Sequence, residues 1–202
     1  MSRFITFEGI DGSGKSTQAR LLADYLSVKG NKVFFTKEPG EGKFGEAIRN
    51  EILDRRDIDI EPYAELCLFC ADRAQHVREL ILPKLKDGYT VICDRYYDST
   101  LAYQGSGREL DPDLVFRMAV ASSLDVEPDV TFFLSIPVEQ ALLRLKDRGR
   151  ERNKMDEEPF EFHNRVDEGY RQLIEKKIPR IKVIEASGSL EETQMEIRRF
   201  FE

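Results

Sequence analysis

The glycine-rich segment at residues 9–17 restricts the possible folds of this chain more than any other part of the sequence. It matches the pattern G-x-x-x-x-G-K-[S/T] in full. Its residues are Gly9, Ile10, Asp11, Gly12, Ser13, Gly14, Lys15, Ser16 and Thr17. An apolar run at residues 4–7 precedes it, and apolar residues at positions 19, 22, 23 and 26 follow at helical spacing. The segment is therefore predicted to join a strand to a helix, which is the setting of a phosphate-binding loop.

The residue types in this loop suit the phosphates of a nucleotide. Glycines let backbone N–H groups turn toward phosphate oxygens, and the helix N-terminus adds positive potential. Lys15 is expected to reach the β- and γ-phosphates of ATP, and the Ser16 hydroxyl to bind Mg²⁺. Asp94 ends another apolar strand, where its carboxylate can reach the Mg²⁺ shell through water, although a turn or helix cap is the alternative role. A chance glycine-rich turn is the alternative for the loop itself, and the flanking strand and helix argue against it.

Short apolar runs alternate with amphipathic helical patterns along the rest of the chain. The further runs lie at residues 33–35, 90–93, 130–134 and 182–184. This alternation predicts an α/β fold with a five-stranded parallel sheet, helices on both faces and a ligand crevice at the carboxyl ends of the strands. Gly30 is a predicted helix stop. Ser189 to Glu192 form a capping-box pattern at the start of a last helix, which carries Leu190, Gln194, Ile197 and Phe201 along one face. With 202 residues, we expect one domain over residues 1–202.

Composition excludes several classes of function. The formal net charge of −7 argues against a nucleic-acid-binding surface. No apolar run approaches the ~18 residues of a membrane helix, and the chain enters a strand without a signal peptide, so we expect a cytoplasmic protein that binds no membrane. Cys67 and Cys70 form a lone C-x-x-C pair, and buried thiols on a helix face are favoured over a zinc site, which needs four ligands.

Several sequence blocks occur in order along nearly the whole chain. They read F-E-G-x-D-G-x-G-K-S-T-Q at residues 7–18, E-P-G at 38–40, F-C-A-D-R at 69–73, D-R-Y-x-x-S-T-x-A-Y-Q-G at 94–105 and F-x-x-R at 162–165. Together they resemble the thymidylate kinase family, and the block at 94–105 is far more specific than the phosphate loop alone. The resemblance implies a three-layer phosphate-loop NTPase fold, ATP and thymidine monophosphate as substrates, Mg²⁺ as cofactor, a homodimer and a step of dTTP synthesis.

The resemblance also assigns roles in binding the acceptor nucleotide. Arg73 and Arg95 would grip its phosphate and base, since a guanidinium binds phosphate in a bidentate manner. Phe69 would stack on the pyrimidine ring. An intrahelical ion pair with an acid such as Asp72 is the alternative for Arg73, and core packing is the alternative for Phe69.

Further roles follow for the residues around these groups. Thr100 and Gln104 would hydrogen-bond the edge of the base. Tyr103 resembles the aromatic residue that lies against C2′ of the sugar and disfavours a ribose, with core packing again as the alternative. Asp11 and Glu38 would help to place the acceptor, its deoxyribose and the metal-bound water.

A charged segment at about residues 147–157 resembles the mobile lid that closes over ATP in this family. A solvated loop is the alternative. Ser13 occupies a position where some relatives carry an arginine, so the cation at the transferring phosphoryl group is expected from Arg150, Arg152 or Lys154. The family's bacterial lids often read D-R-apolar-E, whereas residues 153–156 read N-K-M-D here. The departure leaves open which of the three supplies the charge.

The expected chemistry needs no covalent intermediate, because the acceptor phosphate is itself nucleophilic. In-line positioning is combined with charge neutralisation by Lys15, Mg²⁺, Arg95 and the lid. One alternative is a kinase of the same fold for another nucleoside monophosphate or a deoxynucleoside. A second is an ATPase switch that turns over without an acceptor. A GTPase switch is set aside because no guanine-reading N-K-x-D segment is recognised.

Overall fold

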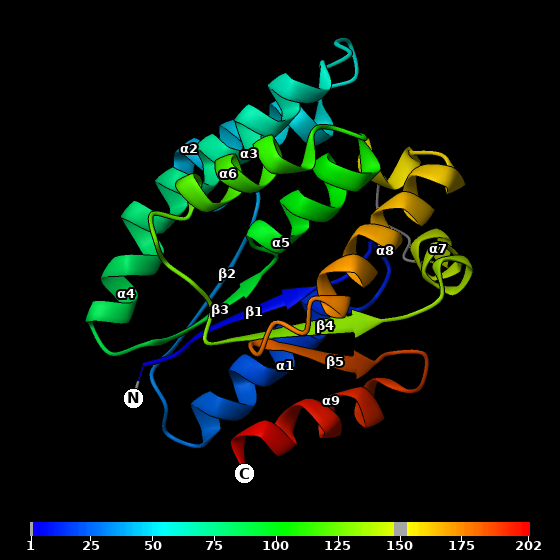
Figure 1. Cartoon of the computed structure of the whole chain (residues 1–202). Helices are drawn as coiled ribbons and strands as arrows, with labels where there is room; N and C mark the ends of the chain where they lie inside the picture. Colours follow the sequence, from blue (N-terminus) through cyan, green and yellow to red (C-terminus); the bar gives the residue numbers. More distant parts are fainter. Residues whose placement is uncertain (1, 148–152) are drawn as a thin grey trace.

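A parallel sheet forms the centre of the molecule (Figure 1). The computed structural model describes residues 2–147 and 153–202. Within this part of the chain the sheet has five strands in the order β2-β3-β1-β4-β5, and every neighbouring pair is parallel. The strands are β1 (Phe4–Glu8), β2 (Val33–Lys37), β3 (Thr90–Asp94), β4 (Val130–Ser135) and β5 (Ile181–Glu185). The predicted fold class is confirmed, and each strand extends its apolar run by one or two residues.

Helices cover both faces of the sheet, as the sequence predicts (Figure 1). On one face, α1 (Lys15–Val28) packs against α9 (Leu190–Arg198). The other face is covered by α3 (Pro62–His76), α4 (Leu82–Lys86), α5 (Tyr97–Thr100), α6 (Pro112–Ser122) and α8 (Phe160–Glu175). α2 (Gly42–Arg49) packs against α3, and α7 (Val138–Asp147) lies beside α8. The result is a three-layer arrangement around a buried sheet.

Alternate residues of the central strands supply the two halves of the core. Ile5 and Ile92 belong to the cluster that α1 and α9 cover, together with Leu22. Phe4 and Val91 point the other way and belong to the cluster on the side of α3 and α6. Because successive side chains of a strand face opposite sides, a strand buried on both faces reads as a continuous apolar run. This is why the strands can be predicted from the sequence.

Three helical segments widen into π-helical turns. They are Asn50–Asp54, Val77–Ile81 and Leu101–Gly107. The last of these continues α5 and packs closely on α8, where a Cβ atom at Gly107 would lie 2.8 Å from both Phe162 and Val166. π-Helical turns are often found at functional sites, and this one carries Tyr103 and Gln104.

Most of the predicted local features are present, with one correction. Gly30 follows α1 with φ +85°, and Ser189 and Glu192 form the capping box of α9. On the face of α9 that carries Leu190, Gln194 and Ile197, the latter two are buried, whereas Leu190 is 44% exposed because it lies in the first turn, next to the exposed cap. Cys67 is exposed, whereas Cys70 is buried, so the expectation of two buried thiols is wrong for Cys67. Among the described helices, none has the length and apolar composition needed to cross a membrane.

Candidate active site

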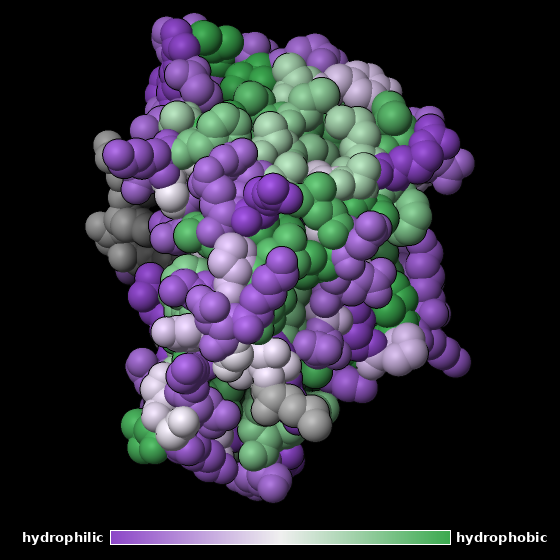
Figure 2. Space-filling view, turned by 90° about the vertical axis from the view of Figure 1, so that its left-hand side faces the viewer, coloured by the Kyte–Doolittle hydropathy of each residue, from purple (hydrophilic) through white to green (hydrophobic). Residues whose placement is uncertain are grey.

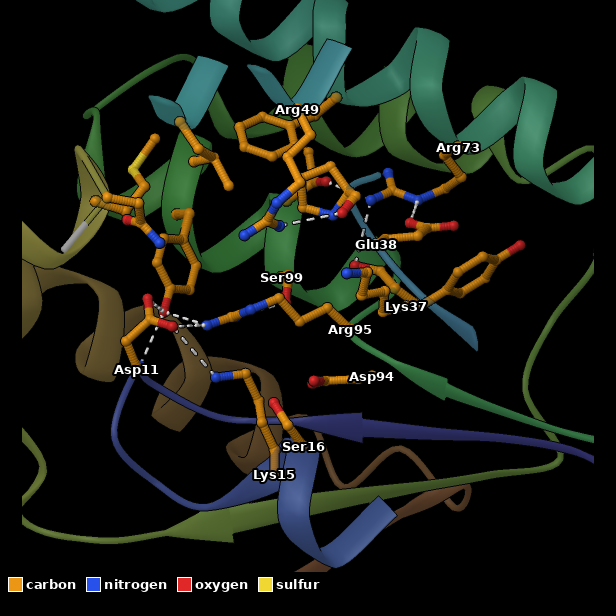
Figure 3. A pocket seen from close by; sticks show the side chains of 18 of the residues that line it. Asp11, Lys15, Ser16, Lys37, Glu38, Arg49, Arg73, Asp94, Arg95 and Ser99 are labelled. Carbon is orange, nitrogen blue, oxygen red and sulfur yellow. Dashed lines mark hydrogen bonds and ion pairs between the residues drawn. The ribbon is translucent and has the colours of Figure 1, made fainter. Parts of the chain in front are cut away.

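A cavity of about 350 Å³ opens where β1, β2 and β3 end at their carboxyl termini (Figure 3). Most of the site residues predicted from the sequence line it. They are Asp11, Lys15, Ser16, Glu38, Phe69, Arg73, Asp94, Arg95, Thr100, Tyr103 and Gln104. The position at the carboxyl ends of parallel strands is the one expected for a ligand crevice in an α/β sheet.

The phosphate loop needs its glycines for geometric reasons. Gly9, Gly12 and Gly14 all have positive φ, at 141°, 87° and 91°. A Cβ atom at Gly12 would lie 2.1 Å from the carbonyl oxygen of Ala141, so only glycine fits there. Ile10, by contrast, belongs to the hydrophobic core. The loop is thus anchored by one apolar residue while its backbone turns toward the cavity.

Lys15 begins α1 and is largely buried at the cavity wall. Its ammonium group donates to the Ile10 carbonyl at 3.2 Å and to the Asp11 carboxylate at 3.4 Å. Ser16 lines the cavity beside it, and Thr17 is exposed outside it. Lys15 is therefore held at the loop by local contacts and faces the space where phosphates would bind.

Asp11, Arg95 and Tyr103 form a hydrogen-bonded cluster at the cavity. Figure 3 shows the side chains of Asp11 and Arg95 directed toward one another. Arg95 donates to Asp11 Oδ1 and to the Tyr103 hydroxyl, both at 2.8 Å, and the Tyr103 hydroxyl donates to Asp11 Oδ2 at 2.8 Å. Burial raises the pKa of Asp11, but the Arg95 and Lys15 charges outweigh it and hold this pKa well below its usual range. Asp11 is therefore a carboxylate that links the phosphate loop to Arg95.

The backbone of Arg95 adopts a left-handed conformation, with φ 75°, which is uncommon outside glycine. The side chain of Glu8, at the end of β1, holds the segment in place by accepting from the Tyr96 N–H at 2.7 Å, from Ser99 Oγ at 2.5 Å and from the Tyr170 hydroxyl at 2.8 Å. Ser99 Oγ also accepts from Arg95 Nη1 at 3.0 Å. Burial, with the nearby Asp98 charge, raises the pKa of Glu8 to about 7.

Glu8 and Tyr170 were not among the predicted site residues. An acid at the end of a fully buried strand was the available signal for Glu8. Its hydrogen-bond partners lie more than eighty residues away along the chain, so no local pattern identifies them.

Arg73 lies on α3 and is almost fully buried. It donates to the Glu38 carboxylate at 2.9 Å, and its Nη2 donates to Thr100 Oγ1 at 2.9 Å. The second Glu38 oxygen contacts His76 Nδ1 at 2.9 Å, and His76 Nε2 contacts Thr36 Oγ1 at 2.7 Å. The partner of Arg73 is therefore Glu38 and not a neighbouring acid of its own helix. His76 was not among the predicted site residues. Its contacts join α3 to Thr36 of β2 and to Glu38, just after that strand.

Phe69, on α3, and Gln104, in the π-helical turn after α5, both line the cavity. Phe69 is half-buried, lines the cavity and also packs against the core cluster that contains Tyr103. Its position is therefore compatible both with stacking on a ligand and with core packing. Gln104 donates from Nε2 to Glu65 Oε1 at 2.8 Å. The Phe69 ring and the Gln104 amide thus line the same cavity as the buried guanidinium of Arg73.

Several cations that the sequence reasoning missed also line the cavity. They are Arg20, Lys37 and Arg49. Arg49 donates to the Pro39 carbonyl at 3.2 Å, and Figure 3 shows its guanidinium directed into the cavity from above. Together with Lys15, Arg73 and Arg95 they make the cavity suitable for anionic ligands, although the chain as a whole is acidic.

Ser16 and Asp94 fit the chemistry of a divalent cation site. Both line the cavity, and Figure 3 shows the Asp94 carboxylate on the same side as the Ser16 hydroxyl. Asp94 Oδ1 is buried and has no hydrogen-bond partner among the described residues. Oxygen ligands of this kind suit Mg²⁺, which also keeps several of its waters.

The charged segment after α7 is described from residue 153 onward, so Arg150 and Arg152 lie outside the described residues. Asn153 and Met155 line the cavity. Lys154 is tied to another segment, because its backbone N–H donates to the Leu53 carbonyl at 3.0 Å and its ammonium group donates to the Ile58 carbonyl. In this conformation the Lys154 side chain does not line the phosphate cavity.

The same segment carries the guanine-reading pattern, because residues 153–156 spell N-K-x-D. The expectation that the chain lacks this pattern is wrong. Here, however, Asn153 Oδ1 accepts from the Asp156 N–H at 2.9 Å, and Asp156 Oδ2 accepts from the Asn153 N–H at 3.1 Å. These polar groups cap a short turn. Asn153 and Asp156 therefore bind each other's backbone in this structure, which is not the arrangement of a guanine-reading pair.

Comparison with known proteins gives one consistent result. A family model described as thymidylate kinase matches residues 7–197. The thymidylate kinase of Desulfovibrio desulfuricans is 43% identical over 98% of this chain and 94% of that protein. The thymidylate kinase of Carboxydothermus hydrogenoformans is 43% identical over 99% and 97%. The crystal structure of thymidylate kinase from Ehrlichia chaffeensis superposes with a TM-score of 0.82 at 34% identity, covering 100% of this chain and 99% of that one.

Proposed function

This chain belongs to the thymidylate kinase family, and we infer that it transfers the γ-phosphoryl group of ATP to thymidine 5′-monophosphate, giving the diphosphate. The observation that carries this function is the cluster that joins Lys15, Asp11 and Arg95. It brings the loop for the donor phosphates and an arginine for the acceptor phosphate to one cavity. A nucleotide switch would not need the second of these groups.

The chemistry follows from placing two anions next to each other. The acceptor phosphate is the nucleophile and needs no covalent enzyme intermediate. Lys15 neutralises the β- and γ-phosphates, and Arg95 holds the acceptor phosphate in line with the bond that breaks. Asp11 orients both cations through one carboxylate oxygen, Oδ1, while its Oδ2 accepts from the Tyr103 hydroxyl. The geometry that supports this role is the pair of Asp11 contacts, 3.4 Å to Lys15 and 2.8 Å to Arg95.

The acceptor base is proposed to lie between Phe69 and the segment after α5. Phe69 offers a stacking face, while Thr100 and Gln104 offer polar groups to the edge of the base. Glu38 fixes Arg73, which reaches this edge beside Thr100. Tyr103 presents its ring toward the sugar and disfavours a ribose hydroxyl. A site that hydrogen-bonds one base edge leaves buried groups unpaired when the wrong base enters, which gives strong discrimination.

Ser16 and Asp94 are proposed to hold Mg²⁺, directly and through water. When bound, the ion neutralises charge on the donor phosphate oxygens. The unpartnered Asp94 oxygen supports this assignment. The charge at the transition state is assigned to the segment at about residues 147–157, with Arg150 or Arg152 preferred because Lys154 is engaged by the Ile58 carbonyl.

A homodimer is proposed from the apolar residues on the outside of α2, α3 and α6. Phe44, Tyr63 and Phe116 are each at least 44% exposed on these three helices. Figure 2 shows apolar side chains gathered in the upper half of this face. A helix that is apolar on most of its surface needs cover on both sides. A second copy, related by a two-fold axis, would supply it.

The direct test is a coupled assay of ADP formation with a panel of acceptors. Thymidine monophosphate is expected to be the best acceptor, with guanosine and adenosine monophosphates much poorer. ADP formation at the same rate without any acceptor would indicate an ATPase switch. Equal rates with a purine monophosphate would indicate a different kinase of the same fold.

A further inference from the structure

Glu65 is a buried acid that the proposed mechanism does not use. It lies on α3, one turn before Phe69, and is 3% exposed. Its Oε1 accepts from Gln104 Nε2 at 2.8 Å, across 39 residues of sequence. A buried carboxylate needs a reason to stay in the fold, because burial of an unpaired charge is costly. Its two partners supply that reason.

The second partner is Arg108, which makes Glu65 an acceptor and never a donor. Arg108 Nη2 donates to Glu65 Oε2 at 2.9 Å, and Nε donates to both Glu65 oxygens at 3.1 and 3.2 Å. Arg108 also pairs with Glu158 at 2.6 Å. A guanidinium in this bidentate position stabilises the ionised carboxylate, which can only accept hydrogen bonds.

The Glu65 carboxylate, as a hydrogen-bond acceptor, fixes the orientation of the Gln104 side-chain amide. The amide has one end that donates and one that accepts. The Nε2 end must face the Glu65 carboxylate, so the Oε1 end is directed elsewhere. Gln104 lines the cavity, and among the residues that the structure describes none donates to Oε1. The end of the amide that Gln104 leaves for a ligand is therefore its acceptor oxygen, Oε1.

We propose that Glu65 is a positioning residue that sets base specificity, because it fixes the Gln104 amide so that Oε1 accepts the N3–H group of the acceptor base. This inference rests on the proposed function. Thymine and uracil carry a hydrogen at N3. Cytosine carries a lone pair there, and two acceptors would then face each other inside a cavity, which costs more than losing a hydrogen bond. The direction of one amide separates the two kinds of pyrimidine.

The test is Glu65→Gln, which is nearly isosteric but can donate as well as accept. The Gln104 amide is then free to turn its Nε2 toward the base. We expect the ratio of kcat/KM for thymidine monophosphate to that for deoxycytidine monophosphate to fall at least about tenfold. Thymidine and deoxyuridine monophosphates should lose activity together, since both carry N3–H. A change in a methyl pocket would separate these two.

Arg108→Lys is the matched control. It removes the bidentate contact but keeps a positive charge beside the Glu65 carboxylate, which still faces Gln104 as an acceptor, so the ratio should stay within about twofold of the wild-type value. If Arg108→Lys lowers the ratio as much as Glu65→Gln does, the geometry of the ion pair and not the amide direction is responsible, and the proposal is wrong. An unchanged ratio in folded Glu65→Gln also overturns it.

A second variant guards against a Glu65→Gln protein that does not fold. The double variant Glu65→Met with Arg108→Met removes both charges of the buried pair together, a change that proteins often tolerate. It also leaves the Gln104 amide without an anchor, and the ratio should again fall. Failure of this inference is distinct from failure of the proposed function, because the latter appears as a wild-type protein that does not phosphorylate thymidine monophosphate at all.

Discussion

Replacing Glu8 by glutamine should remove a large part of the pH dependence of the stability of this protein. Glu8 is almost fully buried and accepts hydrogen bonds from Tyr96, Ser99 and Tyr170. Burial, with the Asp98 charge in addition, raises its pKa from 4.5 to about 7. Glutamine keeps the shape and one acceptor oxygen but cannot ionise, so the variant isolates the titration.

The direction follows from the pKa being higher in the folded state than in the unfolded chain. The stabilising contribution of protonated Glu8 is complete below about pH 4.5 and is lost as the pH rises through about 7. Each pKa unit corresponds to about 1.4 kcal/mol, so the window is worth roughly 3 kcal/mol. Relative to the variant, the wild-type protein should lose this amount of stability between pH 4.5 and 8.

The measurement is the free energy of unfolding from urea titrations at pH 5 and pH 8. The drop in this free energy should be smaller in Glu8→Gln than in the wild-type protein by about 2 kcal/mol, because part of the window lies below pH 5. Glu175→Gln, at an exposed position near the end of α8, is the control and should behave as the wild type. Equal drops in Glu8→Gln and the wild type, within about 0.5 kcal/mol, would refute the assignment of the raised pKa to Glu8.

Three further predictions concern turnover and assembly. Lys15→Met should lower turnover ~10²-fold or more with an unchanged circular dichroism spectrum, since its ammonium group faces the phosphate site; near-normal turnover would eliminate the phosphate-loop mechanism. Either Arg150→Ala or Arg152→Ala should lose at least ~10²-fold in turnover with little change in the acceptor KM. Lys154→Ala should lower turnover only slightly, because the Lys154 ammonium group is bound to the Ile58 carbonyl. Normal turnover in all three variants would mean that the segment is a solvated loop. Sedimentation should give a dimer mass, and a monomer at all concentrations would return the α2, α3 and α6 face to solvent.

The parts of the fold that could be predicted are determined by residues close to one another in the sequence. The strands are apolar runs because the sheet is covered on both faces, and the phosphate loop is a local pattern with a steric reason for each of its glycines. The carboxyl ends of neighbouring parallel strands meet at one edge, so Asp94 and Arg95 could be placed near Lys15 without coordinates.

The parts that could not be predicted depend on contacts between distant segments. Glu8, Glu65 and His76 act on site residues at least 38 positions away, and no local pattern marks such a pair. Arg49, at the end of α2, lines the cavity and contacts the Pro39 carbonyl. The position of α2 relative to the sheet could not be predicted from the sequence. The N-K-x-D match at residues 153–156 shows the opposite error, since a four-residue pattern without its structural setting carries little information.

The pairing of β1 with β3 has a consequence for how this enzyme could be altered. Phe7 lies opposite Asp94 in these two hydrogen-bonded strands, and neighbouring strands are about 4.8 Å apart. The phosphate loop and Arg95 leave the sheet from adjacent strands, so a single interstrand spacing sets the distance between the proposed sites of the two substrates. Protein engineers could therefore rebuild the base pocket on α3 for a new acceptor without resetting the distance over which the phosphoryl group moves.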